Sequence, residues 1–285
     1  MMSDADSPMM IANLSVCMIA HNEEGNLPRA LASVRGWTDQ IIVLDCGSSD
    51  RTSDVARDNG ASVFHAKNNL PELSKNRSFE YADREWIFIV DADEEIPKQL
   101  WDEIATLIAR NPRENGFKIP RRNFYLGSPV MHGGNYPDRQ LRLFRRGRGV
   151  YPTGVFHERL RIDGDVGELT NAFDHHPYPS FSEWMRKLDY YTNYGASKLA
   201  EANVPINAST IRHHMVTRPL RRWVERLVVK RGMRDGVAGV LAASFDFITH
   251  VISFGKYWHM QQQQQTPGHP GKQKSGRPRE AGDPS

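Results

Sequence analysis

Short apolar runs alternate with amphipathic segments over the first hundred residues of the chain. The run Leu14–Ala20 is apolar and rich in β-branched residues, as a strand buried on both faces should be. Asn26 precedes a segment with apolar residues at helical spacing, which predicts a helix that Asn26 caps. The same alternation predicts strands at 40–45, 61–64 and 86–90, and helices through 55–56, from 74 to 82 and from Pro97 onward.

This rhythm predicts a parallel sheet covered by helices on both sides, with ligands at the carboxyl ends of the strands. Between Asn111 and Pro179 the pattern changes to short strands and loops rich in Gly, Pro, Arg and aromatics, which is typical of a loop-built site. From Ser180 the pattern is helical, and Glu183 stands at capping-box spacing from it. The polar sequence after Met260 predicts disorder.

The composition fits one large α/β domain or two smaller ones. The chain has 285 residues and a net charge of +3, which is too small to indicate nucleic-acid binding, so no nucleic-acid partner is expected. Cys17 and Cys46 each lie in or just after an apolar run, which predicts buried, reduced thiols. The N-terminus carries acids where a secretory signal needs positive charge. A reducing cytoplasm fits these features best.

The tripeptide Asp91-Ala92-Asp93 directly follows the apolar run WIFIV and therefore lies at the carboxyl edge of the predicted sheet. Two carboxylates spaced by one residue suit Mn²⁺ or Mg²⁺, which prefer oxygen ligands and keep positions open for diphosphate oxygens. An Asp-rich turn that merely caps the next helix is the alternative.

Asp45 supplies a second carboxylate at a strand end. It is followed by Gly47, which allows close approach of a ligand to the backbone, and by Ser49 and Asp50, either of which could cap the next helix. Capping does not explain Asp45, which could accept a hydrogen bond from a base or ribose.

At this point the sequence resembles a known family. The segments LSVCMIAHNEEGNLPRALASV, IIVLDCGSSDRT, LSKNRS and WIFIVDADEEIP occur in the order and spacing of family 2 glycosyltransferases. The resemblance implies the GT-A nucleotide-diphospho-sugar transferase fold, a mixed, mainly parallel sheet between helices, here with a C-terminal helical module. It also implies a nucleotide-sugar donor, a uridine diphosphate (UDP) sugar, and a divalent Mn²⁺ or Mg²⁺ ion.

The resemblance also implies roles for individual residues. Asp45 would contact the uracil, Asp91 the ribose, and Asp93 the metal that bridges the diphosphate, with Asp91 as a further metal ligand. Arg77 would be the basic residue facing the nucleotide, where a fixed cation neutralises charge that grows as the diphosphate leaves. The remaining residues expected around the donor are Ala20, His21, Asn22, Glu23, Gly47 and Ala92.

Further along, YPDRQLRLFRR and GVFHERL are similar to the lipopolysaccharide inner-core β-glucosyltransferases within this family. The resemblance places Glu158 as the catalytic base, which would deprotonate an acceptor hydroxyl and lead to inversion at the anomeric carbon. Arg142 would contact the diphosphate or an anionic acceptor, with Arg139, Arg145 and Arg146 as competitors for that role. The acceptor would be a membrane-associated oligosaccharide or glycolipid such as lipopolysaccharide core, and the sugar glucose.

We therefore expect five segments along the chain. They are a flexible N-terminus (1–10), a nucleotide-sugar-binding α/β half (11–110), an acceptor and catalytic half (111–179), a helical, membrane-associating module (180–260) and a disordered tail (261–285). Adjacent histidines at 175–176 and 213–214 lack ligand-like company at zinc-site spacing, so scaffolding is the better interpretation.

The C-terminal helices carry a basic, amphipathic pattern. Apolar residues at 220, 223, 224, 227 and 228 share one face, and basic residues at 221, 222, 226 and 230 lie on the other side. Such a face binds an anionic membrane surface or packs on the protein's own core. The apolar stretch 237–254 contains Asp246 and His250, which disfavours a spanning helix. We expect peripheral attachment at the cytoplasmic face of the inner membrane.

Three other functions are open at this stage. A phosphatase with an aspartyl nucleophile also uses Asp-x-Asp after a strand, although here the motif follows the fourth predicted strand and not the first. A dinucleotide-binding dehydrogenase is disfavoured because no G-x-G-x-x-G follows the first strand. A non-catalytic module that binds anionic lipid or nucleic acid would leave the three strand-end aspartates unexplained.

Overall fold

The computed structural model describes residues 10–67, 71–152 and 159–265. These residues form two compact units. The first holds the chain up to Trp184 together with Arg226–Ala242, and the second holds Met185–Glu225 and the chain from Ala243 onward. The boundaries of the five expected segments stay a prediction.

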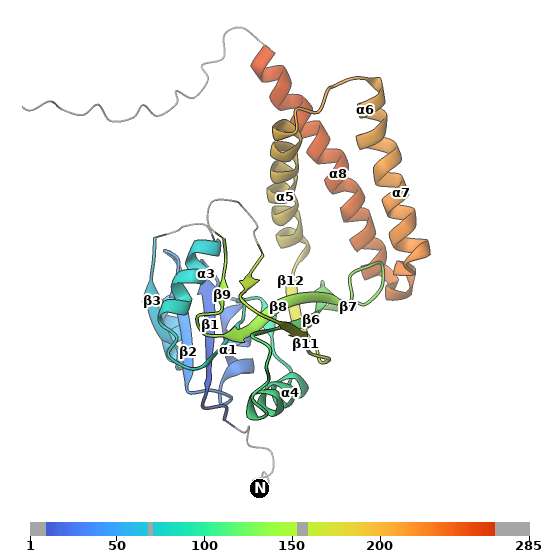
Figure 1. Cartoon of the computed structure of the whole chain (residues 1–285). Coiled ribbons are helices and arrows are strands. Elements are labelled where there is room, and N and C mark those ends of the chain that lie inside the picture. Colours follow the sequence, from blue (N-terminus) through green and yellow to red (C-terminus); the bar gives the residue numbers. More distant parts are fainter. Residues whose placement is uncertain (1–9, 68–70, 153–158, 266–285) are drawn as a thin grey trace, which may run out of the picture. The chain divides into compact units, whose positions relative to one another are not determined.

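In the described part of the chain, ten strands of the first unit form one mixed sheet (Figure 1). Eight follow the order β3-β2-β1-β4-β8-β6-β12-β5, and β7 and β11 pair with β6. A separate pair joins β9 (Gly149–Val150) to β10 (Arg161–Ile162). The strands of the large sheet are β1 (Leu14–Ala20), β2 (Gln40–Asp45), β3 (Ser62–His65), β4 (Trp86–Ile89), β5 (Glu94–Glu95), β6 (Gly116–Tyr125), β7 (Ser128–Val130), β8 (Asp138–Arg145), β11 (Val166–Glu168) and β12 (Phe173–Tyr178).

The pairing of the central strands explains where a ligand site forms. Strand β1 runs parallel to both β2 and β4, and Ala20 at the end of β1 lies opposite Asp45 at the end of β2. The carboxyl ends of three strands therefore meet at one edge. Antiparallel β8 joins the other side of β4 with Leu143 opposite Phe88. This register brings residues of the second half of the chain to the same edge.

Helices cover both faces of this sheet because its strands are apolar on both sides. On one face Val16 and Met18 pack with α1, α2 and α4, and on the other Cys17 packs near α3. Trp101 of α4 stacks on Trp37 and donates its indole N–H to the Ser33 carbonyl. The helices are α1 (Leu27–Val34), α2 (Thr52–Asp58), α3 (Pro71–Glu80) and α4 (Lys98–Ala109).

The second unit is helical. Phe254 and Tyr257 form its core with Ala196, and the Tyr257 hydroxyl donates to the Val204 carbonyl. Asp246 accepts two hydrogen bonds from Arg222, each 2.9 Å long. Its helical segments, some shared with the first unit, are α5 (Phe181–Glu201), α6 (Ala208–Arg212), the π-helical turn η2 (His213–Thr217), α7 (Arg218–Val224), the π-helical turn η3 (Glu225–Val229), the 3₁₀ turn η4 (Gly232–Asp235) and α8 (Gly236–Gln265).

Three local predictions are wrong. Asn26 does not cap α1: its own backbone is helical and its side chain donates to Glu23. Helix α3 begins at Pro71, three residues earlier than predicted, because proline suits a first helical turn. Helix α8 continues through Gln265, so part of the tail that we expected to be disordered is helical. Glutamine has good intrinsic helix propensity, which a count of apolar residues does not register.

The helical stretch Gly232–Gln263 is long and apolar enough to cross a membrane, judged by length and composition alone. The core helix of a soluble protein also meets that criterion, so this feature carries little weight. The apolar face predicted around Leu220 is largely exposed. Leu220 and Val224 are 49% and 42% exposed.

Candidate functional site

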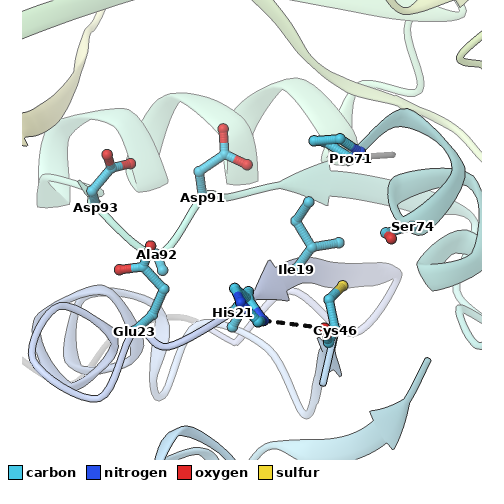
Figure 2. A pocket seen from close by; sticks show the side chains of 10 residues that line it. Ile19, His21, Glu23, Cys46, Pro71, Ser74, Asp91, Ala92 and Asp93 are labelled. Atoms are coloured by element: carbon cyan, nitrogen blue, oxygen red, sulfur yellow. Dashed lines mark hydrogen bonds between the residues drawn. The ribbon is translucent and has the colours of Figure 1, made fainter. Parts of the chain in front are cut away.

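A pocket of about 240 Å³ opens at the carboxyl ends of β1 and β4 (Figure 2). Figure 2 shows Asp91 and Asp93 on the turn that follows β4, with His21 and Glu23 contributed by the segment that follows β1. Six of the predicted donor-site residues line it, namely Ala20, His21, Glu23, Asp91, Ala92 and Asp93. Ile19, Cys46, Pro71 and Ser74 complete the lining.

Asp91 lies between two cations at the centre of the site. One carboxylate oxygen, Oδ1, is 2.8 Å from Lys75 Nζ, and Oδ2 is 2.7 Å from Arg142 Nη2. Arg142 also pairs with Glu94, whose second oxygen accepts the Asp91 backbone N–H at 2.9 Å. The Glu94 side chain is only 1% exposed. Asp91 and the buried Glu94 therefore fix the position of Arg142.

The pKa values follow from this arrangement. Burial alone would raise the pKa of Asp91, but the neighbouring Arg142 and Lys75 cations hold it well below the usual range. Burial raises the pKa of Glu94 to about 7, against the lowering effect of Arg142, and the negative charge of Asp91 adds to the rise. Asp91 is thus ionised at neutral pH, whereas Glu94 exchanges its proton near pH 7.

Asp93 lies beside His175, with 3.5 Å between Asp93 Oδ2 and His175 Nε2. His175 Nδ1 is 2.7 Å from Asn123 Oδ1, and because that oxygen only accepts, Nδ1 carries the proton and Nε2 is left as the free acceptor. Burial lowers the pKa of His175, which favours the neutral imidazole. The neighbouring His176 is a scaffold residue: it stacks on Phe124 and its backbone N–H donates to the Asp93 carbonyl.

A carboxylate and an imidazole acceptor are ligand types that Mn²⁺ accepts. Among the described residues no three His, Cys, Asp or Glu side chains gather into a metal site of their own. An ion that also takes diphosphate oxygens needs only one or two protein ligands. Asp93 and His175 therefore fit a metal shared with a substrate. Both oxygens of Asp91 already face cations, so Asp91 fits the metal less well than predicted.

Asp45 organises the loop after β2 and does not line the pocket. It is 4% exposed, its Oδ1 accepts the Ser48 N–H at 2.8 Å, and its Oδ2 accepts the Ser53 hydroxyl. Burial alone would raise the pKa of Asp45, but these hydrogen bonds lower it overall. Gly47 adopts a positive φ of 82° in this loop.

Asn22 also belongs to this loop system. Its side-chain oxygen accepts the Ser49 N–H at 2.8 Å, and its own N–H donates to the Ser48 hydroxyl. It does not line the pocket, whereas His21 does, through a ring that lies 3.2 Å from the Cys46 carbonyl. The loops after β1 and β2 thus hold each other in place beneath the pocket.

On α3 it is Lys75 that contacts Asp91, and the predicted role of Arg77 stays a prediction. Arg77 is exposed and lines neither pocket described here. Residues 71, 74, 75 and 78 share one face of α3 by helical spacing, and Ser74 and Ser78 on that face are buried. Position 77 lies off this face. The spacing of the buried serines could have identified Lys75 from the sequence.

A second, basic pocket of about 420 Å³ shares Asp91 with the first. Arg142 and Arg139 line it. Arg145 and Arg146, the other two arginines considered for contact with the diphosphate or an anionic acceptor, lie elsewhere. Arg145 pairs with Glu85 and packs over Trp86, and Arg146 donates to the Arg84 carbonyl. Arg142, opposite the end of β4, is therefore the arginine that reaches Asp91. Glu158, the predicted base, lies outside the described residues.

The family model of glycosyl transferase family 2 matches residues 15–161. An uncharacterized glycosyltransferase of Rickettsia bellii is 35% identical over 210 residues, which cover 68% of this chain and 69% of that protein. The chain belongs to glycosyl transferase family 2. The match includes every lining residue of both pockets.

Two other relatives of this family 2 chain have names that are more specific. It is 27% identical over 196 residues to the lipopolysaccharide core biosynthesis glycosyltransferase LpsC of Rhizobium meliloti, covering 66% of this chain and 72% of that protein. It is 33% identical over 192 residues to a TPR repeat-containing protein of Synechococcus elongatus. That match covers 67% of this chain but only 45% of the relative.

The mixed sheet and flanking helices of this family 2 chain match the predicted GT-A fold class, and two solved structures are similar to the chain. Glucosyl-3-phosphoglycerate synthase from Mycobacterium tuberculosis, solved with Mn²⁺ and UDP, is 23% identical, with a TM-score of 0.32 over 40% of this chain and 44% of that one. TarS 1-349 of S. aureus, solved with UDP-GlcNAc, is 14% identical, with a TM-score of 0.46 over 84% of this chain and 82% of that one. The predicted fold class is confirmed.

Proposed function

We propose that this glycosyltransferase moves a sugar from a UDP-sugar, with inversion, to a hydroxyl of a membrane-associated oligosaccharide or glycolipid such as lipopolysaccharide core. The observation that carries the proposal is that Asp91, with its basic partners Lys75 and Arg142, lies beside Asp93 at one strand edge. The name of the LpsC relative supports the lipopolysaccharide acceptor. We place the reaction at the cytoplasmic face of the inner membrane, with glucose as the preferred sugar.

The donor would lie along the first pocket. Two fixed cations beside Asp91 suit a diphosphate, because they neutralise the charge that grows on it as the sugar leaves. Arg142 is held by two acids and Lys75 by one, so neither has to reorganise during the reaction. Asp93 and His175 would hold Mn²⁺ or Mg²⁺. When bound, the ion would neutralise diphosphate charge and orient the leaving group.

Glu158 would act as the base. An acceptor hydroxyl must lose a proton as it attacks the anomeric carbon, and a carboxylate within hydrogen-bond reach takes it up. Attack from the face opposite the leaving diphosphate inverts the anomeric centre. Arg159, the neighbour of Glu158, lines the basic pocket, which supports an acceptor site on that side of Asp91.

A panel of UDP-sugars tested with and without manganese examines the donor half of this proposal, with binding followed by calorimetry. Transfer to lipopolysaccharide core fragments examines the acceptor half. Glu158→Gln should retain donor binding and lose transfer by a factor of about 10² or more, the usual contribution of a general base. Glu201→Gln, at an exposed glutamate of α5, is the matched control and should transfer normally. Normal turnover by Glu158→Gln would remove that residue from the role.

A further inference from the structure

The basic pocket carries more positive charge than the donor site uses. Six basic residues line it, against the acids Asp91 and Asp138. Arg121 is paired with Asp138, and Lys75 and Arg142 are paired with Asp91. The remaining basic residues of the lining are Lys118, Arg139 and Arg159.

The positive charges of these three residues are little neutralised by nearby acidic side chains. Lys118 and Arg159 are exposed, and neither forms an ion pair within the described part of the chain. Among the residues that the structure describes, Arg139 pairs only with Glu168, at 3.1 Å, and both side chains are well exposed to solvent. Such exposed pairs are weak and give way readily to a stronger anion.

Arg142 adds a buried guanidinium to the lining of the same pocket, where its side chain is 6% exposed. Neutral sugar hydroxyls do not require several cations, whereas phosphate and carboxylate groups bind guanidinium groups in charge-assisted pairs.

We propose that the basic pocket binds a phosphate or carboxylate group carried by the acceptor, next to the hydroxyl that is glycosylated. This inference rests on the proposed function, because the pocket shares Asp91 with the donor site. The acceptor class is thus narrowed to anionic sugars. Lys118, Arg139 and Arg159 would set that specificity.

The test uses glycerol 3-phosphate as the anionic probe and glycerol as its neutral counterpart. Both are titrated by calorimetry into the full chain saturated with UDP and manganese, so that the donor's own phosphate site is filled. Glycerol 3-phosphate should bind and glycerol should not. The variant Lys118→Gln/Arg159→Gln should weaken glycerol 3-phosphate binding about tenfold, and Arg110→Gln/Arg113→Gln, at two exposed arginines outside the pocket, should not.

Competition between glycerol 3-phosphate and UDP for one site would overturn the inference, and so would equal binding by both double variants. Failure of UDP to bind with manganese would instead defeat the proposed function, so the two failures are distinguishable. UDP affinity should be the same in both double variants. That result also serves as the check that they fold.

A different surface carries a second inference. In the first unit, Val228, Val229, Met233 and Val237 are 61%, 72%, 64% and 77% exposed. Exposed apolar side chains grouped in this way indicate an interaction surface. Basic residues lie among them, at 230, 231 and 234, and Asp235 is the one acid in the sequence between 226 and 240. We call these residues the 228–237 patch.

The 228–237 patch is anchored to residues His132 and Gly133, which follow β7 in the same unit. The Gly133 N–H donates to the Lys230 carbonyl at 2.8 Å, and the Asp235 carboxylate, 4% exposed, binds both the backbone N–H and the ring of His132. His132 thus partners the one acid of this segment. At Gly232 a β-carbon would lie 2.6 Å from the Arg226 carbonyl, so the turn requires glycine.

We propose that the 228–237 patch docks onto an anionic membrane surface. Aliphatic side chains on a firmly held turn enter the interface between headgroups and acyl chains, and the surrounding Lys and Arg residues attract anionic lipid. Charge complementarity selects a bilayer over a second copy of the chain, because two copies would bring the same basic residues together.

Sedimentation with vesicles tests this proposal. The full chain should bind vesicles of phosphatidylcholine with 30% phosphatidylglycerol, a composition of about physiological anionic content, and should bind pure phosphatidylcholine weakly. Val229→Glu/Val237→Glu should abolish binding, and Arg231→Gln/Arg234→Gln should weaken it about fivefold for each charge removed. The controls are Val166→Glu, at another exposed valine, and Arg110→Gln/Arg113→Gln on the surface near α4.

Equal vesicle binding by Val229→Glu/Val237→Glu and Val166→Glu would overturn the proposal, as would a wild-type chain that does not sediment with anionic vesicles. A change of oligomeric state in the valine variants, seen by analytical ultracentrifugation without a change in vesicle binding, would assign the patch to self-association instead. UDP binding with manganese should be unaffected, which separates this outcome from loss of folding.

Discussion

Arg142 Nη2 lies 2.7 Å from Asp91 Oδ2, although the two residues are 51 positions apart in the chain. The antiparallel pairing of β4 and β8 sets this contact, because Leu143 lies opposite Phe88 and the next step along each strand leads to Arg142 and the end of β4. The first half of the chain supplies the acid and the second half the cation. The edge of the sheet that carries Asp91 and Arg142 is therefore complete only when both halves of the chain have folded together.

Arg142→Met should destabilise the protein by about 3 kcal/mol, because it leaves the buried Glu94 without its cation. The loss should be larger at pH 8 than at pH 5.5. Protonated Glu94 needs no cation, so the loss of Arg142 matters less at pH 5.5. As the pH rises through the folded pKa of Glu94, about 7, the stability from the raised pKa is lost, and the buried carboxylate that forms needs Arg142. Urea unfolding at the two pH values measures the difference.

Arg148→Met is the matched control for this substitution. Arg148 also pairs with an aspartate, Asp163, but both side chains are more than half exposed. Its removal should cost about 1 kcal/mol or less at either pH. Equal losses for the two variants would mean that the buried pair contributes no more than a surface pair.

Lys75→Gln should weaken UDP binding in manganese about tenfold, the effect of losing one charge-assisted contact of about 1.5 kcal/mol. Arg77→Gln should leave it unchanged, because Arg77 is exposed and lies off the pocket face of α3. Calorimetry on the pair provides the comparison. The reverse ranking would restore Arg77 to the role that the sequence suggested.

The sequence predicted the strands of the donor half well because each is a short, continuous apolar run. Leu14–Ala20 and Gln40–Asp45 form strands with the predicted bounds. The position of Asp91 and Asp93 at a strand end followed from the same pattern. Helix boundaries were less accurate, because α3 has few apolar residues to mark its extent.

The partners of these acids could not be predicted in the same way. Glu94 stands next to Asp93 in the sequence, but its burial depends on Arg142, which β8 brings from elsewhere. His175 reaches Asp93 through the antiparallel pairing of β12 with β5, in which His175 lies opposite Glu94. Local spacing carries no information about such long-range pairings. This is why His175 looked like a scaffold residue.

Asp45→Asn should remove part of the acid sensitivity of the fold. The pKa of Asp45 is lowered in the folded chain, so its contribution is present above the unfolded value of 3.8 and is lost as the pH falls through the folded value. The stability difference between wild type and Asp45→Asn should therefore shrink from pH 6 towards pH 3. Asp58→Asn, at the exposed end of α2, is the control and should change the stability little.

Asp93→Asn should abolish the part of UDP binding that depends on manganese while leaving metal-free binding in place. Asp93 lies 3.5 Å from His175, whereas Asp91 is held between Lys75 and Arg142. His175→Gln should weaken the manganese-dependent part about tenfold or more, since an imidazole acceptor is a good ligand and an amide a poor one. Calorimetry with and without manganese separates the two contributions.

Asn123→Leu extends this test to the residue behind His175. Asn123 Oδ1 fixes the proton on His175 Nδ1, so its loss should let the ring change tautomer and weaken metal-dependent binding by about 10-fold. His259→Gln, at an exposed histidine of the second unit, is the control. If Asn123→Leu and His259→Gln bound UDP and manganese equally well, His175 would not be a ligand whose tautomer matters, and Asp93 would have to hold the ion with the diphosphate alone.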